Sequence, residues 1–508
     1  MGQIAHRVNL NATNFPFLSQ HMGQSVIVRQ QDSNFIPTVS SKSDEDKDVG
    51  IPQVYYCHNV VPTSGGFASV GYDQVAPPTT VDTFTYVLQL RDVQDRKALL
   101  GVCSATGQFW VLRDGAVAWQ QLTLLASAIG RLVTVAFVAG VTYIYIERIA
   151  CYSYNFATNM LENVELLGLD TSTIIGVVAN SGYLIVWSLT AVAWSSTTNV
   201  RDFVPSIATG AGGGSLEGAK GAIVALIAAV AGFVAYTTVN AVACSYSGNS
   251  RFPFNFKEII GAGGLISTEL AAVDGNNGLQ YVYTTYGLQA ISFQQATAVF
   301  PELTDFVAGQ WMEDFNEATR QFTLQAVAVL KKKLTLINGR YLILSYGVTE
   351  LTHAVVYDIG LKRFGKFKVT HVDCAEYNLP VAASYESAKR SIVFVQKTGK
   401  LLQVNSSYPS NQQGVLLLGK YQYMRQRMLQ IDAVEVENVR AGAQFSAYLW
   451  SSMDGKNNQQ ETAMYLAKDA GDYRKYLVRK VGKNHSVLLI GAFSVVSIQL
   501  AFNIHGRM

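Results

Sequence analysis

A repeated pattern of glycine, strand-like residues and alanine constrains this chain more than any other feature. The pattern occurs four times, and in three copies Ala follows Gly nine positions later, at 107 and 116, 182 and 191, and 232 and 241. In the other copy Gly140 leads to Ile149, and Ala150 follows. Such agreement over several positions is improbable by chance. The copies are TGQFWVLRDGAVAWQQ from Thr106, AGVTYIYIERIACYSY from Ala139, SGYLIVWSLTAVAWSS from Ser181 and AGFVAYTTVNAVACSY from Ala231.

Each copy is typical of a β-hairpin. The first Gly supplies the positive φ of a tight turn, and a second turn follows at Asp114-Gly115 or Val239-Asn240. We therefore expect three strands per unit. Less regular copies occur later, and the spacing of all anchors brackets the ~40 to 50 residue period of β-propeller blades. The seven anchor glycines are Gly107, Gly140, Gly182, Gly232, Gly278, Gly339 and Gly399.

The register of the repeat also interprets the most apolar run, GAIVALIAAVAGFVAY at 221–236. It predicts a strand from Gly221 to Val230, a turn at Ala231-Gly232 and a strand from Phe233 to Thr238. The run has 16 residues, fewer than the ~20 of a bilayer-spanning helix. We expect no stable membrane insertion. The alternative, that the uncharged stretch 221–250 inserts into a membrane under special conditions, predicts leakage of liposomes.

These patterns predict an all-β protein with two parts. Residues 80–404 hold the seven anchors and are expected to form a β-propeller of about seven blades, with six or eight as alternatives. The flanks, 1–79 and 405–508, contain further strand-like stretches. Because chain ends usually lie close together, we expect the flanks to form one β-rich platform domain.

The charge is divided unevenly along the chain. Residues 1–330 carry 15 Lys and Arg against 24 Asp and Glu, whereas residues 331–508 carry 24 against 12. Basic residues in the second part could contact DNA phosphates without reading bases, or an acidic neighbouring subunit. The alternative is that they are solvated or pair with acidic neighbours in the same chain. The candidates are Lys331, Lys332, Lys333, Arg340, Arg474, Lys475, Arg479 and Lys480.

Motifs for catalysis, cofactors or metals are not recognised. The glycine-rich stretch GAGGGSLEGAKG lacks the Gly-Lys-Ser/Thr ending of a phosphate loop, and the seven His are scattered without a metal-binding pair. The five Cys are far apart, which is typical of reduced thiols in a cytoplasm. The first residues contain no apolar segment of an export signal. We expect neither an enzyme nor a cofactor or metal site.

Several stretches resemble tail nozzle or tail tube proteins of short-tailed bacteriophages. They are YYCHNVVPTSGGFASVGY at 55–72, RDFVPSIATGAGG at 201–213, YSGNSRFPFNFKEIIGAGGLIS at 246–267, VYTTYGLQAISFQQATAVFPELTDF at 282–306 and VVYDIGLKRFGKFK at 355–368. The resemblance implies a virion structural protein with a rigid propeller. It also implies a ring, usually a hexamer, below the portal and adaptor proteins, with DNA passing through the channel and fibres or spikes outside.

Two classes of function follow. The first is a nozzle ring in the virion tail, assembled in the host cytoplasm, that conducts and gates genomic DNA without sequence recognition. The alternative is a propeller enzyme or a carbohydrate-binding propeller, which requires convergent polar residues or a metal at the propeller mouth.

Overall fold

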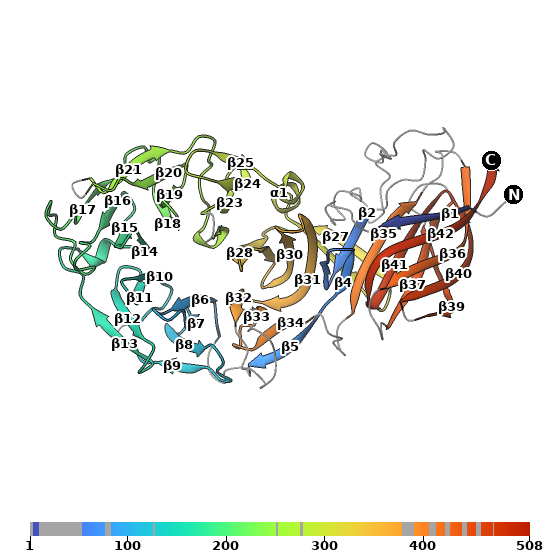
Figure 1. Ribbon diagram of the computed structural model, residues 1–508, viewed down its shortest axis with the longest axis horizontal. Helices are drawn as coiled ribbons and strands as arrows, with labels where there is room; N and C mark the ends of the chain where they lie inside the picture. Colours follow the sequence, from blue (N-terminus) through green and yellow to red (C-terminus); the bar gives the residue numbers. More distant parts are fainter. Residues whose placement is uncertain are drawn as a thin grey trace.

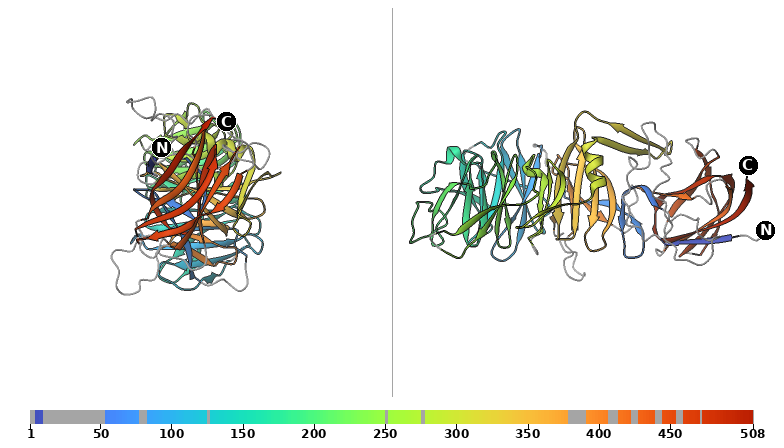
Figure 2. Two further views of the ribbon diagram at one scale, coloured as in Figure 1. Left: turned by 90° about the vertical axis from the view of Figure 1, so that its right-hand side faces the viewer. Right: turned by 90° about the horizontal axis from the view of Figure 1, so that it is seen from above.

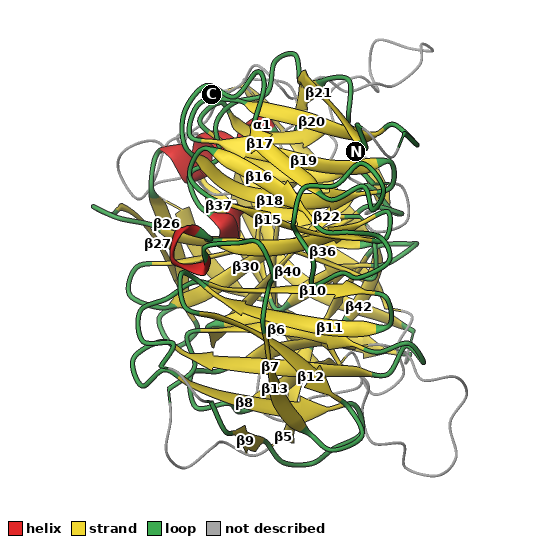
Figure 3. Ribbon diagram, turned by 90° about the vertical axis from the view of Figure 1, so that its left-hand side faces the viewer, coloured by secondary structure: helices red, strands yellow, loops and turns green. Residues whose placement is uncertain are grey.

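The computed structural model describes residues 4–9, 53–76, 83–124, 127–249, 252–274, 278–377, 391–405, 413–421, 427–438, 444–453, 459–470 and 472–507. The stretch 10–52, which the sequence assigned to the platform, lies outside these ranges. Nearly all regular structure in the described residues is β, as predicted (Figure 3). A propeller-like ring of sheets forms one end of the molecule, and a compact group of long strands forms the other (Figure 1).

The ring consists of antiparallel units of four strands. The first three units contain β6 (Tyr86–Arg91), β7 (Lys97–Cys103), β8 (Gln108–Arg113) and β9 (Gln120–Leu122); β10 (Val133–Val138), β11 (Val141–Ile146), β12 (Ala150–Asn155) and β13 (Met160–Val164); and β14 (Gly176–Asn180), β15 (Tyr183–Trp187), β16 (Ala191–Trp194) and β17 (Gly212–Ser215).

The following units continue in chain order around the ring. They contain β18 (Ile223–Ala229), β19 (Gly232–Thr237), β20 (Ala241–Tyr246) and β21 (Phe254–Glu258); β22 (Ala271–Val273), β23 (Gln280–Thr284), β24 (Gly287–Ile291) and β25 (Ala296–Ala298); β28 (Lys331–Ile337), β29 (Tyr341–Gly347), β30 (Leu351–Asp358) and β31 (Arg363–His371); and β32 (Asp373–Tyr377), β33 (Ser391–Val395), β34 (Leu401–Asn405) and β5 (Gly71–Ala76).

The anchor glycines form turns, as predicted. All seven have positive φ, between +61° and +150°. Gly140, Gly182, Gly232 and Gly339 each lie at the turn between the first two strands of a unit, whereas Gly107 lies between the second and third. The expectation of three strands per unit was wrong, because each unit contains a fourth strand.

The apolar run at 221–236 forms two paired strands, as predicted. β18 and β19 are antiparallel, with Ala229 opposite Gly232. A Cβ at Gly232 would lie 2.1 Å from the carbonyl oxygen of Cys244 on the neighbouring strand β20. Among the described residues, no helix has the length and apolar character to cross a membrane.

Strand β5 changes one predicted domain boundary. It pairs with β34, with Gly71 opposite Asn405, and so belongs to the ring. The sequence placed residues 1–79 in the platform because all seven anchor glycines lie at 80–404. An N-terminal strand thus completes the sheet formed by β32, β33 and β34, which come from the end of the propeller segment.

Two sheets form the platform and share one apolar core. The strands are β1 (Ile4–Asn9), β2 (Gln53–His58), β3 (Val60–Pro62), β4 (Phe67–Ser69), β35 (Gly414–Tyr421), β36 (Arg427–Asn438), β37 (Gln444–Ser452), β38 (Gln459–Ala463), β39 (Tyr465–Asp469), β40 (Tyr473–Gly482), β41 (Asn484–Ala492) and β42 (Ser494–Arg507). Strands from both flanks therefore meet here, because β2 pairs with β35, and β1 and β4 pair with β42.

The ring and the platform are joined in two ways. One eleven-stranded sheet runs from β28–β31 of the ring through β3 and β4 into β42, β36, β40 and β39. In addition, a hairpin of β26 (Trp311–Asn316) and β27 (Gln321–Ala326) follows the only α-helix in the described residues, α1 (Pro301–Ala308). This hairpin, which we call the latch, extends from the ring toward the platform (Figure 2).

Candidate functional site

The centre of the ring encloses a cavity of about 840 Å³. Its lining comes from the first strand of every ring unit, namely β6, β10, β14, β18, β22, β28 and β32. Apolar side chains such as Leu88, Val135, Ile227 and Leu336 line the wall. The successive inner strands thus surround one shared space.

A charged cluster lines one side of the cavity. Lys333 Nζ lies 2.6 Å from Asp373 Oδ2 and 3.9 Å from Glu269 Oε1. The buried Asp373 also accepts hydrogen bonds from the backbone N–H groups of Val87 and Cys374, both at 2.9 Å. Burial acts to lower the pKa of Lys333, but the two carboxylates outweigh it and raise the pKa. Lys333 is therefore held as a cation.

Further polar groups line the cavity. Glu147 Oε2 accepts a hydrogen bond from the backbone N–H of Leu132 at 3.2 Å, and Glu147 Oε1 lies 3.7 Å from Arg148 Nε. Arg131 is exposed, and Glu376 lies 3.2 Å from Lys97 Nζ. The charges around the cavity are consequently paired in large part.

One aromatic ring reaches the cavity through a gap in the inner wall. Gly176 on β14 has no side chain, and a Cβ there would lie 2.4 Å from Cη2 of Trp187 on β15. The indole fills this space and lines the cavity although Trp187 is on the second strand of its unit. Its Nε1 is buried and has no hydrogen-bond partner among the described residues.

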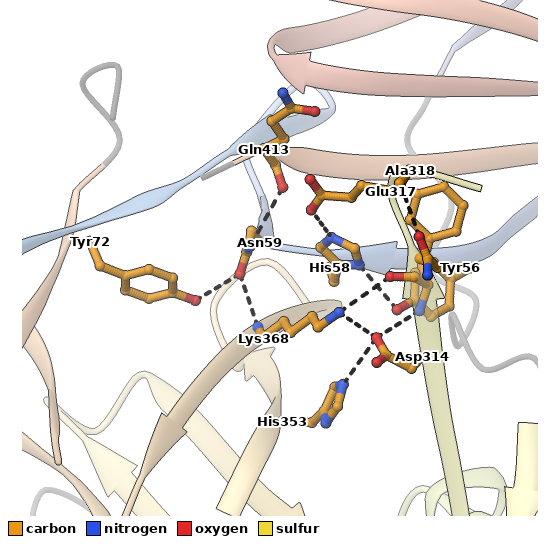
Figure 4. A network of polar contacts seen from close by, with 12 residues as sticks. Tyr56, His58, Asn59, Tyr72, Asp314, Glu317, Ala318, His353, Lys368 and Gln413 are labelled. Atoms are coloured by element: carbon orange, nitrogen blue, oxygen red, sulfur yellow. Dashed lines mark hydrogen bonds and ion pairs between the residues drawn. The ribbon is translucent and has the colours of Figure 1, made fainter. Parts of the chain in front are cut away.

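A second polar cluster lies where the latch meets the ring and the platform (Figure 4). Glu317 Oε1 lies 3.5 Å from Nε2 of the buried His58, and Asp314 Oδ1 lies 2.5 Å from Lys368 Nζ. His353 Nε2 is 4.0 Å from Asp314. Burial lowers the pKa of His58, and that of His353 to about 4, so both imidazoles are neutral at pH 7. The hydrogen bond from His58 lowers the pKa of Glu317.

The junction cluster also fixes the chain that links the domains. Asn59 Oδ1 accepts hydrogen bonds from the Tyr72 hydroxyl at 2.8 Å and from the Lys368 backbone N–H at 2.9 Å (Figure 4). Nearby, Lys366 and Glu313 form an ion pair in which both side chains are fully buried. Lys366 Nζ also lies 4.7 Å from the centre of the Tyr56 ring. Burial lowers the pKa of Lys366 to about 7.

The structure separates the three consecutive lysines predicted to form a basic stretch. Lys331 donates a hydrogen bond to the carbonyl of Thr349 at 2.6 Å. Lys332 lies over the Tyr283 ring at 4.6 Å, and burial lowers its pKa. Lys333 lines the central cavity. Alternation along β28 therefore gives neighbouring lysines different surroundings.

The other candidate basic residues lie far from the cavity or pair with acids. Arg340 Nη2 lies 2.7 Å from Asp358 Oδ2, Arg474 Nε lies 2.9 Å from Asp469 Oδ2, and Lys475 Nζ lies 2.8 Å from Glu435 Oε1. Arg479 is exposed and Lys480 half-buried on β40 of the platform. The eight candidates are thus divided between β28, the adjoining turn and the platform, and several have acidic partners.

Sequence reasoning named Lys333 but missed its acidic partners and the residues of the junction cluster. Glu269, Asp373 and Trp187 are far apart in the chain, and no short motif contains them. Lys366 lies in the stretch VVYDIGLKRFGKFK at 355–368, and no local pattern there predicts its burial. Within the described ranges, no group of three or more His, Cys, Asp or Glu side chains is arranged to hold a metal ion.

Comparisons with known proteins find structural likeness only. No protein-family model and no curated protein matches the chain. The extracellular domain of a one-component system from B. thetaiotaomicron aligns with 9% identity and a TM-score of 0.42, over 88% of this chain and 62% of that domain. The chain therefore spans less than two thirds of that neighbour. The WD40 β-propeller domain of Doa1 aligns with 8% identity and a TM-score of 0.39, over 66% of this chain and 97% of that domain.

Proposed function

We propose that this chain is a structural protein of a short phage tail, which forms a ring-shaped nozzle that conducts DNA. The stretches quoted above carry the resemblance, and the rigid connection between propeller and platform is the structural observation that supports it. Hydrogen-bonded strands continue from β28 of the ring to β39 of the platform in one sheet. A wall that withstands the passage of DNA requires such a connection.

The latch adds a second connection beside the continuous sheet. Its Phe322 packs against Tyr56 of β2 and Trp450 of β37, with ring centroids 4.9 and 5.2 Å apart. Arg320 at the start of β27 also lies 2.5 Å from Glu461 of β38. Two separate attachments resist bending between the domains better than one linker, because interfaces joined only by a linker allow domain motion.

In this proposal the ring contains seven blades, with β28–β31 as the sixth and β32–β34 plus β5 as the seventh. The central cavity of each propeller is lined by Glu147, Glu269 and Asp373 and would repel phosphates. DNA would therefore pass through the channel between subunits of the assembled nozzle rather than through the centre of any one propeller.

The charge division favours contacts between unlike surfaces of neighbouring subunits. Residues 1–330 have 24 acidic against 15 basic residues, and residues 331–508 have 12 against 24. A head-to-tail contact between these parts of neighbouring chains closes into a ring of subunits if the rotation between subunits is suitable. The assembled ring of subunits would bind portal and adaptor proteins on one side and carry fibres or spikes outside.

Electron microscopy and mass photometry of the purified full chain test this proposal. The expected result is a ring with a central pore, alone or after addition of adaptor and portal proteins. Arg479→Glu, in the exposed basic surface of β40, is expected to weaken assembly, whereas Lys397→Glu in the exposed pair with Glu350 serves as a control of equal charge change. Monomers without a pore, even with adaptor present, would contradict the proposal.

A further inference from the structure

We propose that the central cavity of the propeller is a binding site for a neutral saccharide. The proposal is independent of ring assembly and depends on three observations: the size of the cavity, its mixed lining and the pairing of its charges.

The size and lining of the cavity match those of small-molecule sites. Ligand pockets usually occupy ~300 to 1,000 Å³ and combine apolar walls with a few polar groups. This cavity has about 840 Å³, with apolar walls at Leu88, Val135 and Ile227. Tyr86 and Trp187 add aromatic surface. Apolar and aromatic walls suit the C–H faces of a sugar ring, while polar groups suit its hydroxyls.

The charges favour an uncharged ligand. Lys333 is neutralised by Asp373 at 2.6 Å, and Glu147 and Glu376 lie near Arg148 and Lys97. An anion would approach several carboxylates, and a cation would compete with Lys333. Hydroxyl groups can donate to a carboxylate and accept from an ammonium group without separating these pairs.

Glu269 and Trp187 provide specific points of recognition. The Glu269 side chain is 47% exposed and contacts Lys333 only at 3.9 Å, so its carboxylate can accept a further hydrogen bond. The Trp187 ring fills the space left by Gly176 and gives the ligand an aromatic surface at this side of the cavity.

The test measures binding of defined probes to the full-length protein by saturation-transfer NMR and tryptophan fluorescence. Glucose, galactose, N-acetylglucosamine and their trisaccharides are compared with glucosamine, inorganic phosphate and a short single-stranded DNA. The expected result is saturable binding of at least one neutral sugar, with weaker or no binding of the charged probes. Binding only of phosphate, glucosamine or DNA, or no binding of any probe at about 20 mM ligand, the weak end of millimolar affinities, overturns the proposal.

Two variants locate the site. Glu269→Gln preserves shape but removes a charged acceptor, and Trp187→Phe preserves an aromatic ring but reduces the aromatic surface. Glu269→Gln is expected to weaken sugar binding about tenfold, the usual effect of losing one hydrogen bond to a ligand, and Trp187→Phe is expected to weaken it less. Glu350→Gln removes an exposed carboxylate that pairs with Lys397 and is the matched control.

Thermal unfolding verifies that each variant folds, and the half-exposed Glu269 gives a result even if Trp187→Phe does not fold. Binding unchanged in Glu269→Gln overturns the assignment to this cavity, and it leaves the nozzle proposal unaffected because ring formation is measured separately.

Discussion

The buried pair of Lys366 and Glu313 gives a quantitative prediction about the latch. Both side chains are fully buried, Lys366 on β31 of the ring and Glu313 on β26 of the latch. Burial lowers the pKa of Lys366 from 10.5 to about 7, which corresponds to a cost of about 5 kcal/mol for the charged ammonium. The Glu313 carboxylate in contact with the ammonium offsets a cost of this order, because a close pair of unit charges attracts by about 4 kcal/mol at an effective dielectric constant of ~20.

Glu313→Gln removes this offset. We expect the latch to lose about 3 to 5 kcal/mol of opening free energy at pH 7, as is usual when one partner of a buried pair is removed. Because the folded-state pKa of Lys366 is below its unfolded value, the penalty is complete below pH 7. It then decreases by about 1.4 kcal/mol per pH unit as the pH rises from about 7 toward 10.5. The variant should therefore be more stable at pH 9 than at pH 7.

Hydrogen exchange followed by mass spectrometry measures the opening of peptides from 311–326 and 363–371 at both pH values. The double variant Glu313→Leu with Lys366→Met should recover most of the lost stability, because an apolar pair needs no charge compensation. Glu350→Gln, which breaks an exposed pair, should cost less than about 1 kcal/mol. A loss below 1 kcal/mol in Glu313→Gln at pH 7, or an equal loss at pH 7 and pH 9, would refute this reasoning.

Further predictions concern turns, thiols and acid stability. Gly232→Ala should lower the melting temperature in calorimetry, because its Cβ would lie 2.1 Å from a carbonyl oxygen at positive φ, whereas Gly115→Ala, with open space, should cost only the ~1 kcal/mol of positive φ. All five cysteines are buried, and burial raises the pKa of Cys57 to about 12, so a thiol reagent at pH 8 should label none of them before unfolding. Burial lowers the pKa of His485 to about 4, so stability should fall as the pH decreases from about 6.5 to 4, by up to about 3 kcal/mol for this residue. His485→Gln should reduce that slope in urea denaturation, and an unchanged slope would exclude His485 as its source.

The sequence predicts the ring well where the signals are local. A glycine turn and its two apolar strands occupy fewer than about 20 consecutive residues, so the pattern at 221–236 is sufficient to predict β18 and β19. Two of the fourth strands could not be predicted because they are short and largely exposed. β17 is GGGS and β9 is QQL, and neither has the apolar alternation that marks a half-buried strand.

The contacts that join distant segments could not be predicted. β5 at 71–76 completes a sheet with strands near 400, and His58 contacts Glu317 of the latch. Each partner alone has an ordinary sequence, and only the closed fold brings them together. The residues of the cavity cluster are likewise brought together only by the closed fold, because Glu269, Lys333 and Asp373 come from three units of the ring.

The junction cluster specifies the register of the latch more than it stabilises the fold. Glu313 and Phe315 lie two residues apart on the same face of β26, and both are buried, at 0% and 1% exposure. A shift of one residue would turn both side chains to the opposite face of the hairpin. Lys366 would then remain buried without its carboxylate, at a cost of several kcal/mol, and Phe315 would lose its contact with Tyr56. We therefore expect the buried ion pair to favour the observed alignment of the latch over a shifted one.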